Sequence, residues 1–284
     1  MPSWTNATDP GRTATTKGVL RPEETARLAD LRRDHPVDPG LWPFVERYWS
    51  VRWDRTGAPP YRSEVLSHPA VNVSVEYGDR PRFGSAMPAV LVHGVVARRF
   101  VVDLAGRGRV TAAKFRPGGW TALTGRPPAP GTIVALRDEL GCDPGKLLAA
   151  VSAHDDDSAC AAALDAALVP AAVEPDVTYL ALLDVLGQML HDRTIVRVEQ
   201  AAAGAGVGVR ALQRLFASYV GVGPKAVLAR YRMHDAVAAL DAGEDDLAGL
   251  AASLGWFDQA HFCRDFRAVV GTTPSAYLAR ATQR

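Results

Sequence analysis

Apolar and polar residues alternate with a period of two in the first part of the chain, which indicates β-strands. In residues 71–77, valine and tyrosine alternate with asparagine, serine and glutamate, so one face of a strand is expected to lie on a core. Further apolar runs separated by glycine lie at 89–96, 100–104 and 109–115. This spacing predicts an antiparallel β-barrel or jelly roll within residues 1–132, after a short helix around 23–33.

The pattern changes to that of helices between residues 133 and 192. Helices are expected at 133–140, 146–151, 159–168 and 177–191. Three aspartates, Asp155–Asp157, precede the third helix, where carboxylates favour a helix N-terminus. A calcium loop would also need a glycine and a terminal glutamate, which are missing here. The helix at 177–191 carries an apolar stripe that suits either the internal core or a dimer, and the segment is expected to connect two domains.

The last part of the chain, residues 193–284, contains an internal repeat with a period of 50 residues. The segment 212–216, Leu-Gln-Arg-Leu-Phe, returns at 262–266 as Phe-Cys-Arg-Asp-Phe. Short helices rich in small residues are expected upstream, at 198–203 and 247–254. Gly206 and Gly255 follow them, and one helix from about 224 to 242 connects the two copies. The chain therefore divides into an α+β arrangement of a β-rich domain, a helical connector and an all-α domain.

Each copy has the pattern of a helix-turn-helix unit, in which small residues let two helices cross closely and a glycine permits the tight turn. The second helices, near 208–219 and 258–269, fit a major groove, and a rigid connection places them in successive grooves. The side chains expected to read bases are Arg210, Gln213, Arg214, Gln259, Ala260, His261 and Arg264. Those expected to contact phosphate are Lys225, Arg230, Arg232 and Arg280. Arg232 could equally pair with Asp235 or Asp241, and Trp256 and Phe257 are expected to pack.

Charge and cysteine content narrow the class of protein. The chain has 32 basic and 31 acidic residues, but residues 1–137 hold 20 basic and 12 acidic ones, whereas 138–192 hold eleven acidic and one basic. A nucleic-acid surface must then be a local patch. The polar start lacks a secretory signal, and no apolar run is long enough to span a membrane, so we expect a cytoplasmic protein. The three cysteines are odd in number and lack metal-knuckle spacing, and we expect no cofactor and no metal.

The stretch from 254 to 277, Leu-Gly-Trp-Phe-Asp-Gln-Ala-His-Phe-Cys-Arg-Asp-Phe-Arg followed after three residues by Gly-Thr-Thr-Pro-Ser-Ala-Tyr, resembles the double helix-turn-helix domain of the AraC/XylS family of bacterial transcription regulators. The first unit, with Gly221-Val-Gly-Pro, supports this resemblance, although Gly208 stands where the family commonly has a capping Ser or Thr. The run 109–123, with Phe-Arg-Pro-Gly-Gly-Trp, resembles the N-terminal domain of a mainly actinobacterial subgroup. The resemblance implies double-stranded DNA, a second copy of the chain and RNA polymerase as partners.

The same resemblance implies that the N-terminal domain senses a small molecule or mediates association. Aromatic residues expected to line a ligand pocket are Trp42, Trp49, Tyr61, Phe100 and Trp120. A ligand-free dimerisation module is the main alternative. A metal-dependent jelly-roll enzyme is disfavoured because His68 and His93 stand alone, and an alkylation-repair fusion because Cys142 and Cys160 lack an activating neighbour. We therefore expect no enzymatic activity.

Overall fold

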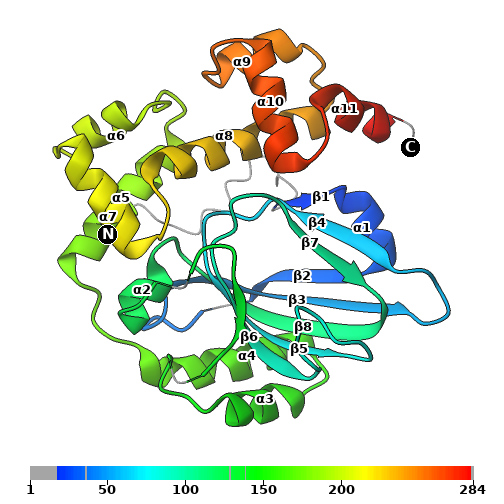
Figure 1. Ribbon diagram of the computed structural model, residues 1–284. Helices are drawn as coiled ribbons and strands as arrows, with labels where there is room; N and C mark the ends of the chain where they lie inside the picture. Colours follow the sequence, from blue (N-terminus) through cyan, green and yellow to red (C-terminus); the bar gives the residue numbers. More distant parts are fainter. Residues whose placement is uncertain (1–17, 36, 128, 138, 283–284) are drawn as a thin grey trace.

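A computed structural model describes residues 18–282 except 36, 128 and 138. A β-rich N-terminal part carries helices against one face of its larger sheet, and the C-terminal helices lie across its upper edge (Figure 1). This arrangement confirms the predicted fold class, an antiparallel β domain joined to an all-α domain.

Two antiparallel sheets form the N-terminal part. The larger has the strand order β2-β3-β8-β5-β6-β9, and the smaller has the order β1-β4-β7. The strands are β1 (Val19–Leu20), β2 (Asp30–His35), β3 (Val45–Arg55), β4 (Tyr61–Val65), β5 (Asn72–Gly78), β6 (Ala89–His93), β7 (Phe100–Leu104), β8 (Gly106–Phe115) and β9 (Ile133–Ala135). Helix α1 (Pro22–Leu28) is shorter than expected because the chain enters β2, and α2 (Gly119–Thr124) follows β8.

The prediction of a helix at 133–140 is wrong. Residues Ile133–Ala135 instead form β9, which pairs with the edge strand β6 through Leu91–Ala135 and His93–Ile133. Ile133 and Val134 have high β-propensity, and an available sheet edge decides the structure of the segment. Segment 133–192 therefore contributes a strand to the larger sheet as well as connecting the two ends of the chain.

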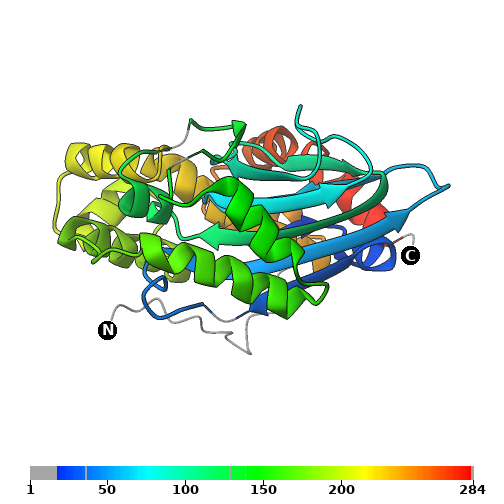
Figure 2. The same cartoon turned by 90° about the horizontal axis from the view of Figure 1, so that it is seen from below.

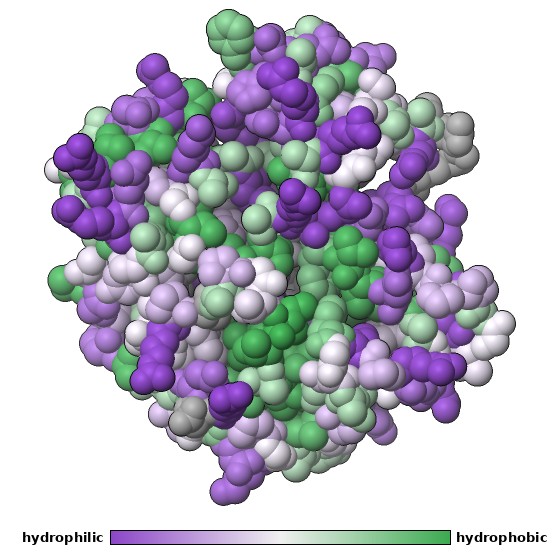
Figure 3. Space-filling model, in the orientation of Figure 1, coloured by the Kyte–Doolittle hydropathy of each residue, from purple (hydrophilic) through white to green (hydrophobic). Residues whose placement is uncertain are grey.

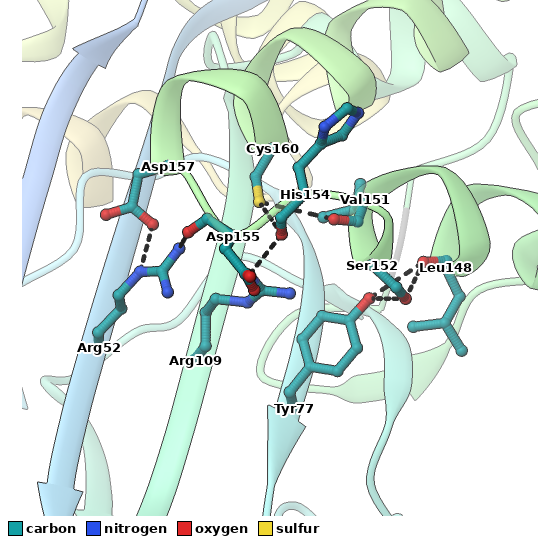
Figure 4. Close-up of polar contacts among 10 residues, drawn as sticks. All are labelled: Arg52, Tyr77, Arg109, Leu148, Val151, Ser152, His154, Asp155, Asp157 and Cys160. Atoms are coloured by element: carbon teal, nitrogen blue, oxygen red, sulfur yellow. Dashed lines mark hydrogen bonds and ion pairs between the residues drawn. The ribbon is translucent and has the colours of Figure 1, made fainter.

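Two helices of the acidic segment, α3 (Pro144–Ser152) and α4 (Asp157–Leu168), cover the outer face of the larger sheet, as Figure 2 shows from below. An ion pair and hydrogen bonds join these helices to the strands. Arg52 of β3 donates to Asp157 at 2.6 Å, and Arg109 of β8 donates to the carbonyl of His154 at 2.7 Å (Figure 4). Tyr48 also donates to Asp165 at 2.7 Å. Polar side chains of β3 and β8 thus hold the helical layer against the sheet.

The predicted alternation in β5 is present, but both of its faces are enclosed. Val73 and Val75 are fully buried in the largest core cluster, together with Leu164 and Leu168 of α4. Ser74 and Glu76 are also buried, at 1 % and 2 % exposure. The polar face is therefore turned to the interior between the two sheets and not to water.

The C-terminal helices contain the two predicted helix-turn-helix units. After a 3₁₀ turn at Val169–Ala171, the helices are α5 (Val177–His191), α6 (Val198–Gly204), α7 (Val209–Tyr219), α8 (Pro224–Asp241), α9 (Leu247–Ser253), α10 (Gln259–Val270) and α11 (Pro274–Thr282). Helix α8 spans from the first unit to the second (Figure 1). Most of the α5 stripe lies inside the molecule, because Leu183 and Leu186 belong to the largest buried cluster and Leu180 and Leu190 pack against it. Only Val177, the first residue of the helix, is exposed, at 81 %, so the stripe mainly serves the internal core.

Candidate nucleic-acid interface and cavity

The second helix of the first unit, α7, has one buried and one open side. Leu212 and Phe216 are fully buried, whereas Arg210, Gln213 and Arg214 are exposed. Gly208 is the N-cap of α7 and provides no side-chain cap, which agrees with the weaker capping expected of glycine relative to Ser or Thr. All three predicted base-reading residues of this unit are therefore accessible together.

Helix α10 repeats this arrangement in the second unit. Phe262 and Phe266 are fully buried, while Gln259, Ala260 and Arg264 are exposed. His261 is half-exposed, and its Nε2 lies 3.3 Å from Asp265 Oδ2. The indole of Trp256 donates to that same oxygen at 2.9 Å. Asp265 therefore orients a predicted base reader and a core residue at once.

The N-terminal part of the chain holds both of these helices near their C-terminal ends. Thr121 donates its hydroxyl proton to the carbonyl of Tyr219, the last residue of α7, at 2.7 Å. In the second unit, the amide of Arg99 donates to the carbonyl of Val269 at 3.1 Å. The N-terminal ends of α7 and α10, which carry Arg210 and Gln259, lie away from these contacts. In helix-turn-helix proteins, the N-terminal residues of the recognition helix meet base edges.

Of the four residues predicted to contact phosphate, Lys225 and Arg280 are exposed. Arg230 differs from the prediction, because it is 6 % exposed and its Nη2 donates to the carbonyls of Val96 and Ala97. Burial lowers the pKa of its guanidinium to about 10. In this conformation Arg230 joins α8 to the loop after β6 and has no access to phosphate.

Arg232 also lies elsewhere than predicted. Its guanidinium carbon is 4.0 Å from the centre of the Trp256 ring, a cation–π contact. The side chain is half-buried, which lowers the pKa of the guanidinium. Within the described part of the chain, its Nε and Nη2 have no hydrogen-bond partner. Stacking on Trp256, and not contact with phosphate, is the role that this geometry gives it.

A cavity of about 170 Å³ lies between the two sheets. Two of the five predicted pocket residues, Trp49 and Phe100, line it, together with Trp53, Phe83 and Val102. On the face shown in Figure 3, apolar side chains gather in the middle of the molecule below the mostly polar helical units. The cavity is mainly apolar, which is the usual character of small-molecule sites.

The other three predicted pocket residues serve the fold instead. The guanidinium carbon of Arg116 lies over the ring of Trp42, 4.6 Å from the ring centre. The Tyr61 hydroxyl is 2.9 Å from that of Thr25. Trp120 is 3 % exposed and packs edge-on against Phe115. These three residues are not part of the lining of this cavity. Aromatic residues also fill cores, and the sequence does not separate the two uses.

Sequence reasoning missed the charged groups of the cavity wall. Glu76 accepts hydrogen bonds from Arg82 Nε at 2.9 Å and from the Ser74 hydroxyl at 2.8 Å, and its Oε1 is 3.2 Å from His93 Nε2. Burial by itself raises the pKa of Glu76, but His93 and Arg82 outweigh it, so the pKa lies below its usual value. The sequence signal for these groups was the row of polar residues on one face of β5, but the sequence does not reveal that this face is enclosed.

The cavity wall continues to helix α8. Lys114 Nζ lies 2.7 Å from Glu46 and 3.4 Å from His68 Nδ1. The His68 ring packs edge-on against Tyr231 and His234, both on α8. Since Lys114 and His68 line the cavity, one layer of side chains separates it from the helix that connects the two helix-turn-helix units.

The environment of Cys160 does not favour a reactive thiol. Cys160 is fully buried, and its thiol donates to the carbonyls of Val151 and His154 (Figure 4). Burial raises the pKa of this thiol, which disfavours the thiolate that a methyl acceptor needs. Among the described residues, no three His, Cys, Asp or Glu side chains are grouped so as to hold a metal ion. Nor does any described helix have the length and hydropathy to cross a membrane.

Two family descriptions and several solved structures match parts of this chain. Residues 201–280 match a family described as a helix-turn-helix domain, and residues 33–132 match a domain of unknown function. No curated protein is significantly similar. Among solved structures, an AraC-type transcriptional regulator from Chromobacterium violaceum is 23 % identical, with 36 % of this chain and 93 % of that chain covered and a TM-score of 0.33. ToxT from Vibrio cholerae is 10 % identical, with 88 % and 97 % covered and a TM-score of 0.43.

Proposed function

We propose that this chain, a DNA-binding transcriptional regulator with an AraC-type helix-turn-helix domain at residues 201–280, reads two successive major grooves with α7 and α10. One observation carries the proposal. Both helices bury their apolar side and leave polar side chains exposed on the other, and Arg214 and Arg264 occupy matched places one 50-residue repeat apart. Arg pairs with guanine and Gln with adenine, and each good pair discriminates by about 1–3 kcal/mol.

Phosphate contacts are proposed for Lys225 and Arg280, which are exposed at the start of α8 and in the last turn of α11. Such contacts fix the register of the protein on the duplex and carry no sequence information. Arg230 and Arg232 are left out because the first guanidinium donates to carbonyls of the N-terminal part and the second stacks on Trp256.

The cavity is proposed to bind a small, mainly apolar effector. A bound molecule would press on Val96 and His68, which line the cavity and contact Arg230 and His234 of α8. If the effector prefers one position of α8, it changes the fraction of molecules whose two reading helices can engage DNA together. The cavity beside α8 favours an effector-binding domain over a ligand-free dimerisation module, because such a module needs no cavity there.

A homodimer and contact with RNA polymerase stay predictions. The apolar stripe of α5 offers little surface to a second copy, because all of it except Val177 is buried or partly buried within the chain.

Competition in a mobility-shift assay tests the DNA proposal. Arg264→Ala should weaken binding to a preferred duplex and hardly affect a scrambled one, whereas equal losses on both would reject base reading by Arg264. A thermal-shift screen with Val102→Trp, which fills the cavity, tests the effector. A compound that stabilises the wild-type chain but not this variant binds there.

A further inference from the structure

The turn of the second helix-turn-helix unit carries an aromatic side chain that packs against nothing. Phe257 is 91 % exposed, the highest exposure of any large apolar residue in the described part of the chain. Its neighbour Trp256 is 6 % exposed and packs against Phe262, with ring centres 5.0 Å apart. The expectation that both residues pack is therefore fulfilled by Trp256 alone.

Comparison of the two turns shows that Phe257 is an added residue. In the first unit, the amide of Val207 donates to the carbonyl of Ala202, and the N-cap Gly208 follows directly. In the second unit, the amide of Trp256 makes the equivalent bond to Ala251, but Phe257 comes before the N-cap. The first turn closes without such a residue, so closing the turn does not require Phe257.

Local geometry directs Phe257 away from the protein. The following residue, Asp258, has an extended backbone, and its side chain accepts a hydrogen bond from the amide of His261 at 2.6 Å. Neighbouring side chains on extended backbone point to opposite sides. An apolar residue before an N-cap often packs on the fourth helical residue, here Phe262, but the exposure of Phe257 excludes that contact.

We infer that Phe257 is an apolar DNA contact, which meets a thymine methyl group or the face of a deoxyribose beside the bases read by α10. The inference rests on the proposed function. Phe257 lies at the free N-terminal end of α10, two residues before Gln259 and on the unit whose exposed Arg264 is proposed to read a base. Phenyl groups suit thymine methyls, and the groove edge covers apolar surface that otherwise stays in water.

The occupant is DNA and not a second protein surface because of what surrounds Phe257. Its exposed neighbours Asp258, Gln259 and Ala260 are polar or small, so no apolar patch extends from it. Protein interfaces of stable size need a contiguous patch around such a residue. A groove edge needs only the single side chain.

The test uses the full chain and the duplex that it enriches from a random-sequence pool, with a scrambled duplex of equal composition as reference. Phe257→Ser should weaken binding to the enriched duplex by about tenfold, from the loss of a partly buried phenyl group. Phe257→Leu should retain most of the affinity. The salt dependence should not change, because no phosphate contact is removed. A thymine contact should leave binding to the scrambled duplex unchanged, whereas a deoxyribose contact should weaken binding to both duplexes. Val173→Ser alters another exposed apolar residue, in the loop before α5, and should have no effect.

Replacing thymine by deoxyuridine in the enriched duplex identifies the atoms involved. If the replacement lowers the affinity of the wild-type chain more than it lowers the affinity of the Phe257→Ser variant, Phe257 contacts a thymine methyl. If it affects both equally, the contact is with deoxyribose. The inference is overturned if Phe257→Ser binds the enriched duplex like the wild type, or if it lowers only the molar mass measured by light scattering, which would assign Phe257 to a contact between copies. A wild-type chain without sequence preference would instead reject the proposed function itself.

Discussion

The imidazole of His68 lies edge-on against that of His234, with ring centres 4.2 Å apart. His68 follows β4 in the N-terminal part, and His234 lies near the middle of α8 between the two helix-turn-helix units. Both rings are deprived of water and face the charge of Lys114, so their pKa values lie below the usual 6.5; that of His234 falls to about 3. Two neutral histidines therefore form the contact between the cavity wall and the connecting helix.

Acid should weaken this contact. Because the folded-state pKa values lie below the unfolded-state value, the unfolded chain binds protons first as the pH falls below about 6.5. Stability is then lost down to about pH 3 for His234, and by pH 5.5 each such histidine should have cost about 1.4 kcal/mol. Urea unfolding at pH 7.5 and 5.5 measures this loss.

His234→Gln should reduce the difference in stability between the two pH values. The control, His191→Gln, alters an exposed histidine at the end of α5 and should leave this difference as in the wild type. An equal loss in all three proteins would show that the buried contact does not sense protons.

Salt dependence separates exposed from buried cations. Lys225→Ala should weaken binding to specific and scrambled duplexes alike and reduce the slope of log K against log salt by about 0.9 for the lost phosphate contact. Arg230→Met should leave that slope unchanged, because the guanidinium already donates to the carbonyls of Val96 and Ala97. A slope reduced as much by Arg230→Met would mean that α8 releases Arg230 when DNA binds.

The buried pair in the cavity wall should be important for stability. Glu76→Gln leaves the Arg82 guanidinium, 7 % exposed, without its carboxylate, and loss of one partner of a buried pair costs about 3–5 kcal/mol. Asp103→Asn breaks the exposed pair with Arg62 and should hardly change the free energy of unfolding. Chemical denaturation at pH 7 compares the two, and similar small losses would show that water reaches Arg82.

Sequence patterns correctly predicted the elements whose ends and packing are determined by residues close to them in the sequence. The helix at 177–191 is found with the predicted limits, because Asp176 caps it and its stripe repeats regularly. The prediction of a helix at residues 133–140 was wrong, because pairing with β6, which is distant in the sequence, determines the structure of Ile133–Ala135. Alternation in β5 showed which residues share a face, but it did not show that a second sheet encloses Glu76.

The candidate DNA surface was predictable for a similar reason. A repeat fixes which faces of α7 and α10 are equivalent, so Arg214 and Arg264 could be assigned together. The environment of single cations could not be predicted, because an arginine on α8 can reach water, a carbonyl or an aromatic ring. Arg230 binds carbonyls and Arg232 stacks on an aromatic ring. Likewise, two adjacent aromatic residues, Trp256 and Phe257, differ only in which one the turn places inward.

Sequencing of duplexes that the full chain enriches from a random pool tests the central claim most directly. Two reading helices in successive major grooves should enrich two blocks of preferred bases with centres about 10–10.5 base pairs apart. Arg214→Ala should relax preferences in one block and Arg264→Ala in the other. Enrichment of no sequence, or of a single block that both variants alter equally, would contradict a reader built from two helix-turn-helix units.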